Sequence, residues 1–336
     1  MTHCYAAWNR KQEVLSQSTS GGVFSALAEL VLADGGIVVG AAYGEGLRVE
    51  YRVAHDSGEL AALRGVKYVF SELGRSVLTE MADALAKGRR VMFVGVPCQA
   101  AAIRKRFGEL KNLLVCDLVC FGTPPGSLWL KYVAWQEERA GRRLKSISPR
   151  DKANGWGRTT YYRYEWEDGR VTRRCSRYDP YARAFYTTLG FRECCFNCQF
   201  RGMERVSDLT LCDMWNAQAL NLPDPVVRGG VSGVMVHSGL GEEMMGLADV
   251  ERLEVPKEVF VEGNFPILKS AEKPGNWAAF DRDGRELSFG DLARKYRLCQ
   301  TPLDFALRRL GILVKGGIFR MLPQRIKNVI KCRLSR

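Results

Sequence analysis

Two cysteines three residues apart are the first candidates for chemistry in this sequence. Cys195 and Cys198 stand in the run Cys195-Phe196-Asn197-Cys198. This spacing places two thiolates within one turn of chain, where they suit a zinc ion, an iron–sulfur cluster or a redox dithiol. The pair alone does not decide among these chemistries, and a four-ligand metal site needs two more cysteines.

Two further cysteines stand at the ends of predicted buried strands. Cys98 comes three residues after the apolar run 91–95, and Cys120 directly follows the apolar run 113–119. The carboxyl ends of parallel strands meet at one edge of an α/β sheet, which is where such sheets place ligands. We therefore expect these two cysteines to join the C-x-x-C pair in one four-thiolate site.

The other seven cysteines have simpler explanations. A single cysteine is most often a small buried hydrophobe. We prefer that interpretation for six of them, Cys4, Cys116, Cys175, Cys212, Cys299 and Cys332. Cys116 and Cys194 stay open as substitutes for one of the four ligands. Because zinc and a 4Fe-4S cluster both accept four thiolates, the number of ligands does not identify the metal.

A second candidate site precedes an apolar segment that is predicted to be helical to about residue 32. It is the run Ser18-Thr19-Ser20-Gly21-Gly22. Its hydroxyls suit a helix cap, its glycines allow close backbone approach, and the free N–H groups of a helix start favour an anion such as a flavin pyrophosphate. An ordinary N-cap explains the same motif equally well.

Two cations further along the chain extend this second site. Arg64 and Lys67 flank Gly65 and precede Tyr68, so they suit a phosphate clamp beside an aromatic wall for a flavin ring, with a solvated turn as the alternative. No Walker loop and no Gly-x-Gly-x-x-Gly fingerprint after a strand is present. The three histidines form no hydrolase arrangement with a serine and an aspartate, so we assign no catalytic residue.

Charge and hydropathy limit the class of protein. The N-terminus lacks a secretory signal and no eighteen consecutive residues are apolar, so we expect a cytoplasmic protein whose cysteines are not disulfides.

Residues 301–336 carry nine Lys or Arg against one acid, which accounts for eight of the thirteen net positive charges. These cations are not interleaved with aromatic residues, so no nucleic acid partner is expected. The tail suits an anionic membrane or an acidic partner, or a basic helix that covers the core.

The pattern of elements predicts an α/β fold. Helix and strand signals alternate through the first 130 residues, which is typical of a parallel βα sheet, and the run 159–175 predicts an antiparallel hairpin. We expect an α/β flavin-binding region over 1–145, a region with the hairpin and the cysteine cluster over 146–265, and a basic helical tail over 266–336.

Five motifs in order resemble one family. The segments 18–24, 63–69, 94–99, 117–122 and 195–215 are together similar to the coenzyme F420 hydrogenase/dehydrogenase beta subunit family, over roughly residues 4 to 260. The resemblance implies an FAD-binding α/β protein with a 4Fe-4S cluster. It assigns the cluster to the four cysteines of the predicted site, and the flavin to the motifs of Ser20-Gly21-Gly22 and Lys67.

The sequence departs from the family pattern at two places. Cys212 stands where relatives usually have glycine, and Cys4 stands alone where many relatives carry a ferredoxin-like cysteine segment. Electrons are then expected from a separate ferredoxin, a flavoprotein, a reduced deazaflavin such as coenzyme F420, or another subunit. Relatives without that segment also occur beside bacterial cell-surface polysaccharide genes, so a sugar or lipid-linked acceptor is one expectation. A zinc-stabilised basic binding module without redox activity is the alternative.

Overall fold

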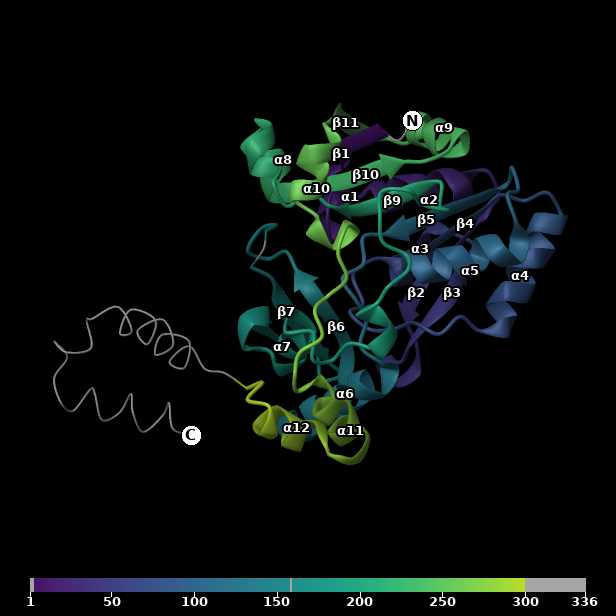
Figure 1. Ribbon diagram of the computed structural model, residues 1–336. Helices are drawn as coiled ribbons and strands as arrows, with labels where there is room; N and C mark the ends of the chain where they lie inside the picture. Colours follow the sequence, from purple (N-terminus) through teal and green to yellow (C-terminus); the bar gives the residue numbers. More distant parts are fainter. Residues whose placement is uncertain (1–2, 158, 300–336) are drawn as a thin grey trace.

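The computed structural model describes residues 3–157 and 159–299 of the chain. A large sheet of eight strands crosses the upper part of the molecule in Figure 1, and a smaller sheet lies below it. In spatial order the large sheet contains β11 (Val250–Glu254), β1 (His3–Asn9), β10 (Ser232–Val236), β9 (Leu209–Asp213), β5 (Leu113–Leu118), β4 (Val91–Gly95), β2 (Ile37–Tyr43) and β3 (Val49–Ala54).

The centre of the large sheet is parallel and its two sides are antiparallel. Strands β2, β4, β5 and β9 pair in parallel, whereas β3 on one side and β10, β1 and β11 on the other pair antiparallel. All five residues of β4 are buried, as expected for a central strand that is covered on both faces. The predicted α/β fold with a parallel core is confirmed, and the sheet takes strands from both sides of residue 145.

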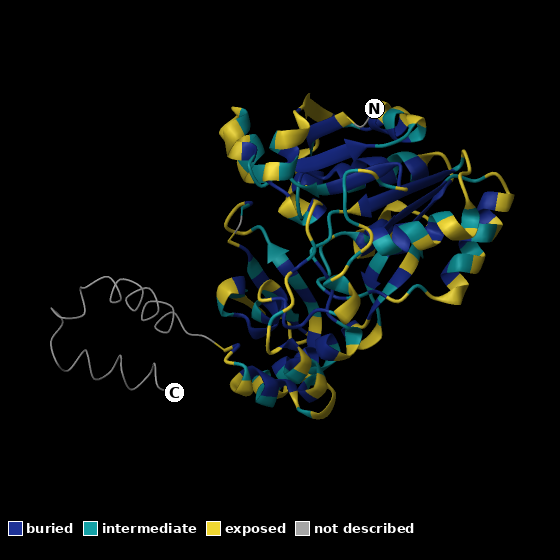
Figure 2. Cartoon of the chain, viewed as in Figure 1, coloured by how far each residue is buried: buried dark blue, intermediate teal, exposed yellow. Residues whose placement is uncertain are grey.

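Helices cover both faces of the large sheet (Figures 1 and 2). On one face, one hydrophobic core joins the sheet to α2 (Val23–Ala33), α3 (Ser57–Leu63) and α9 (Gly239–Leu247). On the other face, a second core joins it to α4 (Arg75–Ala86) and α5 (Pro97–Phe107). Near β1 lie the short helices α1 (Gln12–Gln17), α8 (Asp224–Gly229) and α10 (Lys257–Glu262).

The smaller sheet forms a second layer with its own core. It contains β6 (Leu144–Asp151), β7 (Tyr161–Trp166) and β8 (Val171–Cys175), and the β7–β8 pair is the predicted hairpin. Its core includes side chains of α6 (Gly126–Ala140), α7 (Pro180–Tyr186), α11 (Trp277–Glu286) and α12 (Phe289–Lys295). Over the described ranges, no helix has both the length and the apolar character that are needed to cross a membrane.

The sequence patterns predicted the central elements and missed several outer strands. The apolar runs 91–95 and 113–119 form strands β4 and β5 within one residue of their expected bounds, and the segment expected to be helical to about residue 32 forms α2. The strands that were not predicted are β1, β3, β6 and β11. The last four residues of β11 are exposed and three of them are charged, so it has no buried face to produce a clear apolar pattern. The predicted tail beyond residue 299 lies outside the described residues.

A buried carboxylate organises the second layer. Asp179 is fully buried, and its Oδ1 caps α7 by accepting hydrogen bonds from the backbone N–H groups of Tyr181 and Ala182 at 3.0 and 2.9 Å. Its Oδ2 accepts hydrogen bonds from the hydroxyls of Tyr132 on α6 (2.8 Å) and Tyr164 on β7 (2.7 Å). One side chain thus joins a helix cap, a second helix and the small sheet.

Replacing this carboxylate should destabilise the fold. We expect Asp179→Ala to lower the free energy of unfolding by roughly 3 kcal/mol, because it removes the cap of α7 and leaves the buried hydroxyls of Tyr132 and Tyr164 with only each other as partners. Urea denaturation followed by circular dichroism measures this change. Asp291→Ala, at an exposed ion pair with Arg294, is the control and should lower the free energy of unfolding much less. Equal losses in the two variants would contradict the role given to Asp179.

Candidate functional site

Three segments bring the four predicted cysteines to one end of the large sheet. Cys98 is the second residue of α5 and follows β4, while Cys120 lies two residues beyond β5. Cys195 ends a short 3-10 turn over Glu193–Cys195, and Cys198 follows it. Each of the four side chains is half-buried. Because β4 and β5 pair in parallel, the chain leaves both strands at the same end of the sheet, where Cys98 and Cys120 follow them.

The thiols lie within electrostatic reach of one another. Burial raises the pKa of the Cys98 thiol, and the charges of Cys198 and Cys195 raise it further. Burial also raises the pKa of Cys120 to about 12; Arg201 opposes the rise, and Cys195 and Cys98 add to it. Thiols with raised pKa values keep their protons at neutral pH, and a bound metal centre displaces such protons.

A half-buried arginine ties two of these segments together. Arg201, three residues after Cys198, donates hydrogen bonds from Nη1 to the carbonyl oxygens of Cys120 and Pro266, and from Nη2 to that of Phe121 at 3.0 Å. The backbone N–H of Cys198 donates to Ser270 Oγ at 3.1 Å. The loop after β5, the C-x-x-C segment and the segment 265–270 therefore hold one another in place.

A glycine allows the close approach of the loop after β5 to the segment before Cys195. Gly122 has φ of 151°, and a Cβ placed on it would lie 2.3 Å from the ring of Phe191. The backbone N–H of Arg192 then donates to the carbonyl of Thr123 at 3.1 Å, and the Thr123 hydroxyl lies 3.9 Å from Cys195 Sγ. Any side chain at residue 122 would push the two cysteine-bearing segments apart.

A zinc ion and a 4Fe-4S cluster require different spacings of the four thiol sulfurs. A tetrahedral zinc site with Zn–S bonds of about 2.3 Å needs its sulfurs roughly 3.8 Å apart. Among the residues that the structure describes, no three His, Cys, Asp or Glu side chains gather in a way that could hold a metal ion. In a 4Fe-4S cluster each thiolate binds a different iron, so the thiolates stand further apart. Four thiols from three segments supply the donor type that either group requires.

The glycines and serines before α2 pack against the sheet. Ser18 Oγ donates to Val14 O at 2.7 Å, and Ser20 Oγ donates to Val231 O at 2.9 Å. A Cβ on Gly21 would lie 2.3 Å from the carbonyl oxygen of Ala7. The N-cap of α2 is Gly22, with φ of 77° and no side-chain hydrogen bond. The prediction that a hydroxyl of this run caps α2 is therefore wrong. Ser18 and Ser20 donate their hydroxyl hydrogen bonds to the carbonyl groups of Val14 and Val231 instead.

Arg64 and Lys67 make internal contacts. Arg64 donates to Ser25 Oγ on α2 at 3.0 Å and pairs with Glu29 at 3.2 Å, so it lies beside the helix that follows the serine and glycine run. Lys67 Nζ donates to the carbonyl oxygens of Ala62, Leu63 and Arg64 at 2.8–3.1 Å, at the end of α3. Burial lowers the pKa of Lys67 to about 7.

Two cations near the serine and glycine run were missed in the sequence. Lys152 Nζ donates to the carbonyl oxygens of Leu15, Ser20 and Gly229 at 2.6–3.0 Å, and burial lowers its pKa to about 8. Arg150 lines the same small cleft with Lys152 and pairs with Asp213 at 2.6 Å. Both lie far from Ser20 along the chain, in a run that was assigned only to the hairpin region, so no local pattern indicated them.

Arginines flank the C-x-x-C pair and were also not predicted. Arg192 stands three residues before Cys195, and Arg201 stands three residues after Cys198. Arg192 places its guanidinium 3.8 Å from the centre of the Phe70 ring, and its charge lowers the pKa of Cys98 against the larger effect of burial. Their symmetric spacing about the pair is the signal that could have identified them.

Cys116, Cys212 and His237 lie outside the two candidate sites, in hydrophobic clusters or in a hydrogen bond with a neighbouring strand. Cys116 is fully buried in the core under α2, and Cys212 packs with Phe260 opposite Gly233. His237 shares a 2.9 Å hydrogen bond with Thr210, and burial lowers its pKa to about 4, so it is neutral at physiological pH. Cys212 therefore fills space beside a glycine of the neighbouring strand, within a hydrophobic cluster that contains none of the four predicted ligands.

The fold is an α/β sheet with a parallel centre, and four cysteines from three segments lie near the carboxyl edge of that centre. A family model for the C terminus of the coenzyme F420 hydrogenase/dehydrogenase beta subunit matches residues 88–258, and a model for the N-terminal part of the same protein matches residues 4–78. The first match alone covers more than half of the chain. The chain belongs to this family of hydrogenase and dehydrogenase subunits, which indicates a redox function.

A solved structure has the same fold. A chain of the F420-reducing NiFe hydrogenase complex from Methanosarcina barkeri, determined with xenon derivatization, is 18% identical. The match covers 83% of this chain and 91% of that chain, with a TM-score of 0.50. At this identity the likeness concerns the fold alone. No curated protein sequence matches the chain significantly.

Removing the arginine that joins the cysteine segments should loosen the site. We expect Arg201→Met to lower the free energy of unfolding by roughly 2–4 kcal/mol, because three carbonyl groups lose their donor. Thermal unfolding followed by circular dichroism measures the change. Arg285→Met, which removes an exposed ion pair with Asp281, is the matched control and should alter the unfolding midpoint little. If the two variants melt alike, Arg201 does not hold the segments together.

Proposed function

We propose that the chain is an oxidoreductase that depends on a flavin and a 4Fe-4S cluster. The observation that supports this proposal is that Cys98, Cys120, Cys195 and Cys198 lie within electrostatic reach of one another, in a chain that belongs to a redox family. In this proposal the four thiolates hold the cluster. Arg192 and Arg201 offset part of its negative charge, since each lowers the pKa of a neighbouring cysteine.

FAD is the second proposed cofactor, held at the start of α2. A bound flavin exchanges a hydride on one side and single electrons on the other, which joins two-electron to one-electron chemistry. The first-turn N–H groups of α2 have no intrahelical partner and no capping side chain, so they suit a pyrophosphate. Ser18, Ser20, Gly21 and Gly22 shape this turn, and Arg64 lies beside it. In this proposal Lys67 attracts the pyrophosphate through its charge alone, because its ammonium group already donates hydrogen bonds to three backbone carbonyl groups.

Lys152 supports a negatively charged ligand at the same turn. Its ammonium bonds the carbonyl of Ser20, and the charged groups that act on its pKa, Arg150 and Asp213, form a pair with each other. Among the described residues, Asp213 therefore neutralises the positive charge of Lys152 only in part, because it also pairs with Arg150. An anion near the start of α2 would supply the missing compensation.

The donor and acceptor are the least defined parts of the proposal. We propose a reduced deazaflavin such as coenzyme F420, a ferredoxin or a similar carrier as the donor, and an acceptor that belongs to cell-surface polysaccharide metabolism. The solved relative belongs, by its title, to a hydrogenase complex, which supports a protein redox partner for this chain as well.

The cluster assignment is tested by metal analysis of anaerobically purified protein. We expect about four iron and four sulfide per chain with bound FAD, and loss of most of the iron in Cys195→Ser. Cys194→Ser is the control, because Cys194 is an exposed neighbour and its loss should leave the iron in place. Iron loss in the control instead would make Cys194 a ligand. A colourless protein with one zinc and no flavin would exclude the redox proposal in favour of a zinc-stabilised binding module.

The flavin assignment is tested by the pH dependence of FAD binding. Protonated Lys152 attracts an anion, and its pKa of about 8 lies below that of a free lysine. Affinity should therefore fall as the pH rises from 7 to about 9, and Lys152→Met should bind FAD about tenfold more weakly at pH 7 with little further pH dependence. Quenching of FAD fluorescence measures both. Lys145→Met, which removes a surface pair with Glu165, is the control and should keep the wild-type profile. An unchanged profile in Lys152→Met would remove this residue from the flavin site.

A further inference from the structure

A buried carboxylate in the parallel centre of the large sheet belongs to neither candidate site. Asp117 lies on β5, opposite Gly95 of β4 and Thr210 of β9, and its side chain is only 1% exposed. Its Oδ1 has no hydrogen-bond partner among the described residues. An oxygen of this kind is costly to bury, and the cost is greater when the carboxyl group is ionised. The residue precedes the proposed ligand Cys120 by three positions.

Opposing effects act on the protonation of Asp117. Burial raises its pKa to about 6, although the guanidinium of Arg205 and the hydroxyls of Thr210 and Ser207 lower it. Arg205 Nη1 lies 3.7 Å from Asp117 Oδ2, which is too long for a good hydrogen bond. Ser207 Oγ, like Asp117 Oδ1, is buried without a hydrogen-bond partner in the described ranges. Because neither protonation state is strongly stabilised, a small additional charge is enough to change it.

The other ionisable groups around this carboxylate are held in one state at neutral pH. Cys116 on β5 and Cys212 on β9 keep their protons, because burial raises their pKa values well above the usual value. Asp208, just before β9, pairs with Arg104 of α5 and accepts a backbone hydrogen bond at 2.7 Å, which stabilises its charge. Among these groups, only Asp117 is poised to gain or lose a proton near pH 7.

A polar path leads from Asp117 to the partly exposed His237. Thr210 stands opposite Asp117 in the sheet, so their side chains share one face. The hydroxyl of Thr210 lies 2.9 Å from His237 Nε2. Burial, together with the charge of Arg205, lowers the pKa of His237 to about 4, so its neutral ring can donate a proton at one nitrogen and accept one at the other.

We propose that Asp117 takes up a proton from solvent, through His237 and Thr210, when the proposed 4Fe-4S cluster receives an electron, and releases it when the electron leaves. This inference rests on the proposed function, in which the electron comes from the flavin. The proton comes from water and offsets the negative charge that the electron adds.

The short separation between Asp117 and Cys120 makes this coupling strong enough to measure. Three residues of extended chain span at most about 10 Å. At that distance, with an effective dielectric constant of about 20, one added negative charge raises the proton affinity of a carboxylate roughly tenfold. By linkage, protonation of Asp117 favours the electron on the cluster by the same factor.

The pH dependence of the midpoint potential, measured by spectroscopic redox titration of anaerobically purified protein, tests the coupling. The potential of the unaltered protein should fall between about pH 5 and pH 8 by the equivalent of a tenfold change in the reduction constant, which is about 59 mV for one electron. Asp117→Asn is neutral at every pH, so its potential should be constant and close to the low-pH value of the unaltered protein. A constant potential in the unaltered protein, or an unchanged slope in Asp117→Asn, would overturn the proposal.

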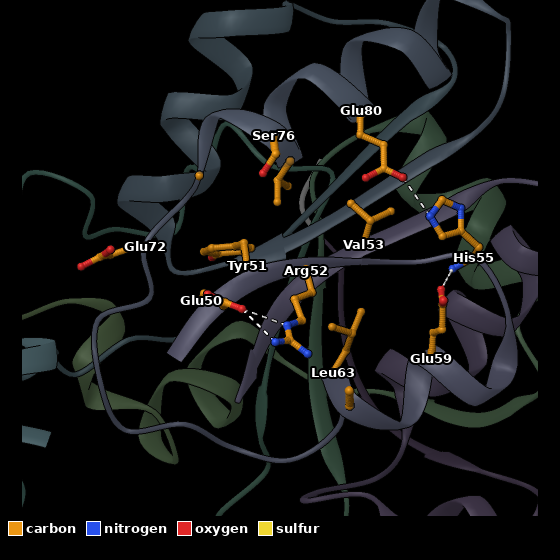
Figure 3. A pocket seen from close by; sticks show the side chains of 13 residues that line it. Glu50, Tyr51, Arg52, Val53, His55, Glu59, Leu63, Glu72, Ser76 and Glu80 are labelled. Carbon is orange, nitrogen blue, oxygen red and sulfur yellow. Dashed lines mark hydrogen bonds and ion pairs between the residues drawn. The ribbon is translucent and has the colours of Figure 1, made fainter. Parts of the chain in front are cut away.

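Glu80 supplies the matched control, because its carboxylate is exposed to solvent. Figure 3 shows Glu80 of α4 beside a groove of about 600 Å³ that passes along β3, where it pairs with the imidazole of His55 at 2.8 Å. Solvent and salt screen a charge in this position. Glu80→Gln removes one carboxylate, as Asp117→Asn does, and should keep the pH dependence of the unaltered protein.

Infrared difference spectroscopy detects the proton itself and does not depend on enzyme activity. With 13C-labelled aspartate, reduction near pH 6.5 should produce the carbonyl band of a protonated carboxyl group in the unaltered protein and in Glu80→Gln, but not in Asp117→Asn. A protein that binds no iron would refute the proposed function and this coupling with it. A protein that holds the cluster but shows no such band on reduction would refute the coupling alone.

Discussion

The candidate metal site depends on the meeting of two chain segments that are more than 70 residues apart in the sequence. The loop after β5 carries Cys120, and the segment 191–201 carries the C-x-x-C pair. Arg201 joins them through hydrogen bonds to carbonyl groups, and Gly122 lets the ring of Phe191 approach the backbone. A half-buried guanidinium that satisfies three carbonyls is costly to remove, since each would lose its donor. This contact holds the segment of Cys120 against the segment that carries the C-x-x-C pair.

The packing of Gly21 shows how a ligand motif and a folding requirement coincide. A side chain at this residue would meet the backbone of β1 at Ala7, and its N–H donates to Ser232 Oγ of β10 at 2.9 Å. The glycine is therefore required by the sheet whether or not an anion binds. Lys152 adds a positive charge to the same turn from a distant part of the chain. This cation distinguishes the turn from an ordinary helix start.

One side chain of strand β3 reaches the cysteine-bearing segments. Tyr51 lies on β3, and its hydroxyl donates to Gln99 Oε1 at 2.7 Å, next to Cys98 at the start of α5. Burial raises the pKa of this tyrosine, and Cys98 and Cys120 raise it further, so its hydroxyl lies near the thiols.

The sequence by itself determined the central strands and helices and indicated which cysteines are candidate ligands. Continuous apolar runs such as 91–95 predicted central strands, because a strand covered on both faces excludes polar residues. Cysteine spacing predicted thiol ligands and two of the strand ends that carry them. Only the tertiary structure decided that β1, β10 and β11 extend the sheet, that Arg201 and Lys152 hold the two candidate sites, and that Ser18 and Ser20 bond away from α2. These features depend on contacts between residues far apart in the chain, which periodicity and spacing do not encode.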